Sequence, residues 1–189
     1  MHYETVPWLT TYTGIKFHFL DPQPEEICIE DIAHALSLTC RFGGHCACMY
    51  SVAEHSVRVA SQPEILPSSK IAALLHDAEE TYIPDIPTPI KHASLEIQRL
   101  NSRINRAVKR KFRIERADWA TIHRVDKRML VTETLALDVD TSDWDGKEEP
   151  YRHLALGDFG WLPDKAEAAF LFAFGYYNKL FGVGGTAGA

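Results

Sequence analysis

Apolar residues recur at helical spacing in several separate segments of the chain. The first segment begins at Ile29, where Glu30 and Asp31 stand in the first turn, and it continues to about Leu38. The other segments with this spacing are 52–59, 68–78, 95–112, 117–132 and 163–177. Alternating apolar and polar positions, which would predict strands, are nearly absent. The pattern therefore predicts an all-α fold, a compact bundle of about six helices of the kind that packs around one core.

The segments outside these helices suggest the organisation of the chain. Residues 1–28 mix aromatic residues, threonine and proline without a sustained period, so we expect an extended N-terminal arm. Residues 29–181 should form a single domain, because a chain of 189 residues suits one hydrophobic core. Residues 182–189 are rich in glycine and predict a flexible tail.

Composition and charge narrow the class of protein. The 46% of hydrophobic and 24% of charged residues are typical of a globular protein. A net charge of -6 argues against binding nucleic acid by bulk electrostatics. No apolar run reaches the roughly 18 to 20 residues that span a bilayer, so no membrane contact is expected. No secretory signal is visible, and we expect a cytoplasmic protein.

Four cysteines fit this expectation as reduced thiols. They are Cys28, Cys40, Cys46 and Cys48. A zinc site formed by the last three together with His45 is an alternative, but the spacing lacks the usual gap of two to four residues in both halves. Free thiols are therefore the preferred interpretation, with His45 as a loop residue near the rim of a pocket.

Residue types that bind metals are spread over three of the predicted helices. His55 belongs to the second helix and Asp126 adjoins the apolar stripe of the fifth. His76 and Asp77 are adjacent and are expected to lie inside the third helix. Two imidazoles and two carboxylates suit a first-row divalent ion. Glu80 follows Asp77 at a spacing of three, so both carboxylates can face the same region.

These residues stand in three motifs. The motifs are S-V-A-E-H-S at 51–56, L-L-H-D-A-E-E at 74–80 and R-V-D at 124–126. Together they resemble the HD-domain metal-dependent phosphohydrolases, whose pattern is a histidine, a His-Asp pair and a distant aspartate. Arg41-Phe42 and the D-x-P-x-P-x-K segment at 85–91 resemble one branch in particular. This branch comprises the bacterial 5'-deoxynucleotidases and the phage or prophage deoxynucleotide triphosphohydrolases, which include dATP triphosphohydrolases.

The resemblance implies a role for each matched residue. One divalent transition metal ion (Mn, Co, Fe, Zn or Ni, or Mg with a triphosphate substrate) would be bound by His55, His76, Asp77 and Asp126. Glu80 would act in catalysis beside Asp77, by orienting or deprotonating the attacking water. The substrate would be bound by Arg41 and Lys91 at its phosphate, by Asp85 at its sugar and by Phe42 at its base.

Several of these residues have simpler interpretations. Arg41 could cap the preceding helix, Lys91 could be a solvated surface residue, and Asp85 could form a turn before Pro87. Glu79 is expected to be a solvated helix residue, because it points about 100° away from Glu80 on a helix.

The resemblance predicts a metal-dependent hydrolase of deoxyribonucleotide phosphate esters, either a 5'-deoxynucleotidase or a dNTP triphosphohydrolase. The alternatives are a non-catalytic nucleotide-binding module of the same fold and a helical nucleic-acid binder that uses the basic run at 103–116. The last helix carries more aromatic residues than one buried face requires, which indicates a homo-oligomer. These residues are Phe170, Phe172, Phe174, Tyr176, Tyr177 and Phe181.

Overall fold

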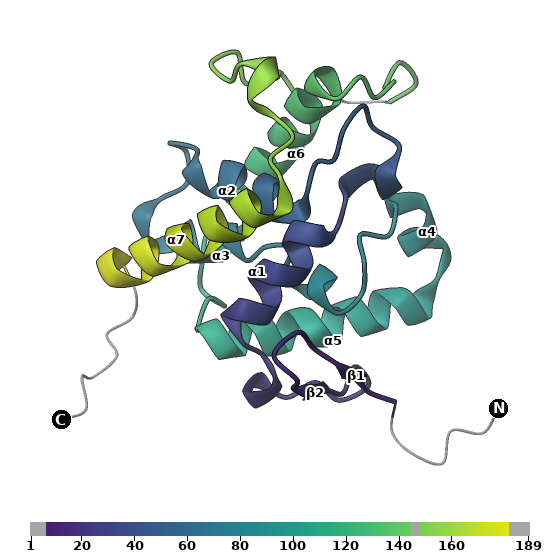
Figure 1. Ribbon diagram of the computed structural model, residues 1–189, viewed down its shortest axis with the longest axis vertical. Coiled ribbons are helices and arrows are strands. Elements are labelled where there is room, and N and C mark those ends of the chain that lie inside the picture. Colours follow the sequence, from purple (N-terminus) through teal and green to yellow (C-terminus); the bar gives the residue numbers. More distant parts are fainter. Residues whose placement is uncertain (1–6, 145–147, 182–189) are drawn as a thin grey trace.

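The computed structural model describes residues 7–144 and 148–181, and within these ranges the chain is a helical bundle (Figure 1). The helices are α1 (Ile29–Leu38), α2 (Val52–Ser61), α3 (Lys70–Leu74), α4 (Thr88–Ala93), α5 (Leu95–Phe112), α6 (Trp119–Ala136) and α7 (Pro163–Phe181). The all-α prediction is confirmed. The short helix α4 was not predicted, because three prolines between residues 84 and 89 indicate a loop rather than a helix.

The segment before α1 contains more structure than an extended arm. Strand β1 (Leu9–Thr10) pairs antiparallel with β2 (Lys16–Phe17) in a small hairpin. Phe17 is fully buried and stacks on Tyr82, with ring centroids 3.6 Å apart. The hairpin is therefore anchored to the domain. The first six residues of the expected arm and the tail at 182–189 lie outside the described residues.

The core lies where α7 packs across α1, α2 and α3, an arrangement visible in Figure 1. Fully buried apolar side chains from these helices meet there, including Leu36, Val59, Leu74 and Phe170. Helix α2 is held at its first turn by Ser51, whose hydroxyl accepts a hydrogen bond from the backbone N–H of Glu54 at 3.1 Å. The core and this cap together fix the orientation of α2.

The third helix is shorter than its apolar pattern predicts. Helix α3 ends at Leu74, and a turn then leads into a 3₁₀ segment at Ala78–Thr81. Leu75 and Asp77 both have φ and ψ near the sparsely populated bridge region, which interrupts the helical ladder. His76 and Asp77 therefore lie in a turn and not inside a helix. The prediction was wrong here because the buried apolar positions continue across the turn, so their spacing does not reveal it.

Candidate metal centre

Three elements bring imidazole and carboxylate groups to one point. His55 comes from α2, His76 from the turn after α3 and Asp126 from α6. The Nε2 atoms of the two histidines are 3.2 Å apart. Asp126 Oδ1 is 3.2 Å from Nε2 of His55 and 3.7 Å from Nε2 of His76. These three groups can therefore hold a metal ion, since their ligand atoms lie within 4.8 Å of one another.

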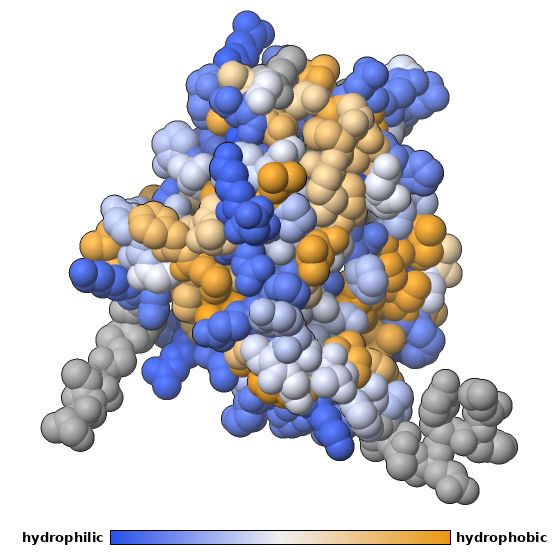
Figure 2. Space-filling view, in the orientation of Figure 1, coloured by the Kyte–Doolittle hydropathy of each residue, from blue (hydrophilic) through white to orange (hydrophobic). Residues whose placement is uncertain are grey.

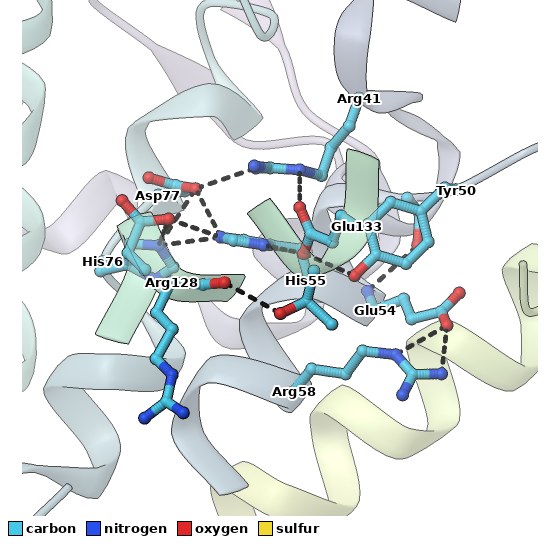
Figure 3. Close-up of polar contacts among 12 residues, drawn as sticks. Arg41, Tyr50, Glu54, His55, Arg58, His76, Asp77, Arg128 and Glu133 are labelled. Carbon is cyan, nitrogen blue, oxygen red and sulfur yellow. Dashed lines mark hydrogen bonds and ion pairs between the residues drawn. The ribbon is translucent and has the colours of Figure 1, made fainter. Parts of the chain in front are cut away.

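Asp77 lies beside the same atoms (Figure 3). Its Oδ2 is 3.2 Å from Nε2 of His76 and 3.6 Å from Nε2 of His55. Adjacent ligands of an octahedral ion with bonds of about 2.1 Å are about 3.0 Å apart. The observed separations of 3.2 to 3.7 Å are somewhat longer than this value, and His55, His76 and Asp126 lie close enough together to hold an ion, with Asp77 beside them.

Hydrogen bonds on the far side of each ring decide which nitrogen faces this point. His76 Nδ1 lies 2.8 Å from the carbonyl oxygen of Ala73, which can only accept, so Nδ1 carries the proton. His55 Nδ1 lies 2.5 Å from Oε1 of Glu133 and donates to it in the same way. In the neutral rings both Nε2 lone pairs then point at each other. Such an arrangement is favourable when a cation lies between them.

Glu133 was not predicted from the sequence. Its carboxylate lies on α6 and is fully buried. It accepts a hydrogen bond from the hydroxyl group of Tyr50 at 2.7 Å, and its Oε2 atom lies 3.3 Å from Nε of Arg41 (Figure 3). Burial alone would raise the pKa of Glu133, but His55 and Arg41 outweigh it and lower the pKa. The signal for this residue was its spacing of seven from Asp126, which places both acids on one face of a helix.

The charges of the cluster favour a positive centre. Burial lowers the pKa of His76, but the carboxylates of Asp77 and Asp126 outweigh it and raise the pKa to about 10. Burial raises the pKa of Asp126, but its hydrogen bonds to His55 and His76 outweigh it and hold the pKa well below the usual range. The two acids therefore stabilise a proton or a cation between the rings.

Arg41 and Phe42 begin a short 3₁₀ segment, Arg41–Gly44. The Arg41 side chain is buried and spans two acids, with Nη1 3.5 Å from Oδ2 of Asp77 and Nε 3.3 Å from Oε2 of Glu133. It therefore does not act as a cap of α1. Phe42 has a φ of 57°, a strained value for a bulky residue, and Gly43 shares this left-handed conformation.

A cleft with a volume of about 680 Å³ opens beside the cluster. Its lining includes the predicted site residues Arg41, Phe42, Asp77, Glu80, Asp85, Lys91 and Asp126. Leu130, Val139 and Trp144 provide apolar surface, and His45 also lies in the lining. The structure thus brings the predicted substrate-binding residues together around one cleft next to the histidines.

Glu80 and Lys91 form an ion pair in this cleft. Lys91 Nζ is 2.9 Å from Oε1 of Glu80, so the lysine is not a solvated surface residue. Oε2 of Glu80 is buried and has no hydrogen-bond partner among the described residues. Burial, together with the negative charges of Asp77 and Asp85, raises the pKa of Glu80 well above its usual range. Glu80 thus lies in the cleft lining with one buried carboxylate oxygen that has no hydrogen-bond partner among the described residues.

Glu79 differs from its prediction as a solvated residue. Its side chain is half-buried and accepts a hydrogen bond from Nδ2 of Asn105 on α5 at 3.3 Å. Burial, reinforced by Asp77, raises the pKa of Glu79 to about 7. The side chain is half-buried because α5 packs over the segment that carries Glu79, a tertiary contact that the spacing along the sequence does not reveal.

The four cysteines are free thiols. Cys40 and Cys46 approach each other, with Sγ atoms 3.9 Å apart. In the described part of the chain, the only ligand atoms close enough together for a metal are those of the histidine and aspartate cluster. The alternative zinc site is therefore not formed there. None of the helices in residues 7–144 and 148–181 combines the length and apolar character needed to cross a bilayer.

Known proteins include two relatives of this chain, although no family model matches it. The chain is 33% identical over 134 residues to the uncharacterized protein YfdR of Escherichia coli K12. The aligned region covers 70% of this chain and 74% of YfdR. It is 38% identical over 128 residues to the uncharacterized protein RCAP_rcc00048 of Rhodobacter capsulatus, covering 64% of this chain and 65% of that protein. Neither name states a ligand or an activity.

Proposed function

The chain belongs to the same family as YfdR of Escherichia coli, and we propose that it is a divalent-metal-dependent hydrolase of deoxyribonucleotide phosphate esters. One observation carries the proposal. His55 and His76 present Nε2 atoms to one point, beside two carboxylates and next to a cleft whose lining includes Glu80, a carboxylate with one unpartnered oxygen among the described residues. The resemblance to HD-domain phosphohydrolases, carried by the same residues, adds the substrate class.

The proposed ligands of one divalent ion, with Mn²⁺ and Co²⁺ as the first ions to test, are His55, His76, Asp77 and Asp126. When bound, such an ion polarises a phosphoryl oxygen and makes water a stronger nucleophile at neutral pH. Glu133 and the carbonyl of Ala73 hold the two rings in the tautomer that leaves Nε2 available.

Glu80 is the proposed proton acceptor. Its Oε2 atom has no hydrogen-bond partner among the described residues, and a carboxylate in the cleft lining can take a proton from a water within hydrogen-bond reach. The attacking water would give its proton to Oε2 while its oxygen bonds to phosphorus, the bond from phosphorus to the leaving oxygen would break, and the proton would then pass to that oxygen, which leaves as a hydroxyl group. Lys91 donates to the other oxygen of Glu80 and so holds the carboxylate in place.

The remaining cleft residues suit the rest of a nucleotide. Phe42, Leu130 and Trp144 provide apolar walls for a base, and Asp85 is an acceptor for a sugar hydroxyl. A volume of about 680 Å³ lies within the range of about 300 to 1,000 Å³ that is typical of small-molecule sites. Among the described lining residues, the arginine and lysine side chains are those of Arg41 and Lys91. Both already form ion pairs with acids. This small positive charge favours a monophosphate over a triphosphate.

Turnover of a nucleotide panel tests the proposal. Purified protein with Mn²⁺ or Co²⁺ would be incubated with ribo- and deoxyribonucleoside mono-, di- and triphosphates, and the products identified. We expect phosphate release from deoxyribonucleoside monophosphates. Glu80→Gln should reduce turnover by about 10² to 10⁴-fold and retain Mn²⁺ binding, whereas Asp77→Ala should lose both. Glu96→Gln, at a carboxylate that is 75% exposed on α5, is the matched control.

Three outcomes would contradict it. Full turnover by Glu80→Gln would remove Glu80 from the reaction. Nucleotide binding without turnover by the wild-type protein would favour the non-catalytic module. Salt-dependent binding to DNA without nucleotide turnover would favour the nucleic-acid binder.

A further inference from the structure

Helix α7 carries an exposed stripe on the side opposite the core. Phe172 is 75% exposed and Tyr176, one turn later, is 52% exposed, and their rings stack with centroids 6.2 Å apart. Phe170 and Ala173 of the same helix are buried against the core. Leu162, just before the helix, is 71% exposed and Leu180, near its end, is 50% exposed. The stripe therefore runs the full length of α7.

The exposed stripe of α7 matches a second copy of itself that runs in the opposite direction. Asp164 near one end and Lys179 near the other are both exposed, and neither forms an ion pair with a described residue. Leu162 and Leu180 form a second matched pair. Each pair is centred within about one residue of Phe172, the geometry that an antiparallel pair of helices on a two-fold axis requires.

Small residues lie on either side of this centre. Ala168 precedes Phe172 by four positions and Gly175 follows it by three, and both are exposed. A Cβ atom built at Gly175 would meet no atom within 4 Å. A phenyl ring from a second helix could therefore enter the space beside Ala168 and Gly175. Two helix axes can then approach to the usual 8 to 10 Å.

We propose that this face of α7 is a homodimer interface, in which two copies of α7 pack antiparallel about a two-fold axis near Phe172. Phe172 meets its own copy at the axis, and Asp164 of each protomer faces Lys179 of the other. A second copy of this chain is the occupant because the opposite charges of Asp164 and Lys179 face each other, and the small residues lie near the axis, when the same helix is reversed.

The position of α7 allows two copies of the chain to pair without covering the cleft of either copy. Figure 1 shows α7 and α4 on opposite sides of the molecule, and α4 carries cleft residues, so pairing through α7 leaves the cleft open. In Figure 2 hydrophobic and near-neutral colours mix with blue along α7. One helix pair is a small interface, so association should depend on protein concentration.

Charge exchange tests the pairing. Sedimentation of the full chain would give the dimer dissociation constant. Asp164→Lys and Lys179→Asp each place like charges opposite one another twice per dimer, and each should weaken association at least about tenfold. The double variant restores both pairs in reversed order and should return to within about threefold of wild type. Failure of the double variant to recover would overturn the antiparallel register.

Cross-linking tests the position of the axis. Phe172→Cys should form a disulfide-linked dimer under mild oxidation, because the two introduced thiols face each other. Leu95→Cys, at a residue 67% exposed on α5, is the matched control and should cross-link no faster than wild type. A wild-type protein that stays monomeric at high concentration, or equal cross-linking of the two variants, would refute the interface. Unchanged thermal unfolding would show that the variants fold.

Discussion

Replacing Glu133 with glutamine separates the role of this buried acid from that of the ligands themselves. Glu133 accepts the Nδ1 proton of His55 and so keeps Nε2 available for a metal. Glutamine has nearly the same shape but carries no charge and can present an N–H to the ring. Partners of this kind are worth 10- to 100-fold in metal affinity, so the affinity for Mn²⁺ should fall by about 1.4 to 2.8 kcal/mol.

The same change should lower the free energy of unfolding. Glu133 is 0% exposed and lies 3.3 Å from Arg41, which is itself buried. Removing one partner of a buried ion pair costs about 3 to 5 kcal/mol, because the other charge remains buried. Arg41 retains Asp77 as a partner and the glutamine oxygen can still accept one hydrogen bond. A loss near the lower end, about 3 kcal/mol, is therefore expected.

Calorimetric titration with Mn²⁺ and urea unfolding measure the two effects. Tyr50→Phe removes one hydrogen-bond donor to Glu133 but leaves the negative charge of Glu133 unchanged. The Mn²⁺ affinity of this variant should therefore stay within about threefold of wild type. Glu96→Gln, on the exposed surface of α5, should change neither quantity. If folded Glu133→Gln protein binds Mn²⁺ as tightly as wild type, Glu133 does not orient His55 for a metal.

Three further predictions concern the scaffold around the site. Ser51→Ala should lower the free energy of unfolding by about 1 kcal/mol in urea, because it removes the cap of α2; no change would mean that the cap is not stabilising. Phe170→Ala, in the core, should cost about 3 to 5 kcal/mol. The matched exposed change on the same helix, Phe172→Ala, should stay within about 0.5 kcal/mol when measured on the monomer, and equal losses would contradict the burial. Burial and the neighbouring thiol of Cys40 raise the pKa of Cys46 to about 11. Because the thiolate is the reactive form, its alkylation rate, followed by mass spectrometry, should rise about tenfold per pH unit up to about pH 11; a plateau by pH 9 would contradict the raised pKa.

Helices with one buried face could be predicted from the chain alone. The apolar stripes that begin at Ile29, Leu95 and Pro163 correspond to α1, α5 and α7, because an amphipathic helix repeats its buried positions every three or four residues. Helix α4 could not be found in this way. It has no buried residue, so it has no stripe.

The motifs identified which residues gather at the cluster but not how they are held there. The His76-Asp77 turn was hidden because its neighbours Leu75 and Ala78 are buried on either side of it. The ion pair between Glu80 and Lys91 joins residues that only the path of the chain through three prolines brings together.

The order of residue types along the chain determined the helices that bury one apolar face, the choice of candidate metal-binding groups and their distribution over three elements. Packing of α6 against α2 decided the rest, because contacts between residues 78 positions apart, such as His55 and Glu133, depend on how helices cross. Spacing along a sequence specifies which face of a helix a side chain occupies, whereas distances between faces of different helices are set by the core that separates them.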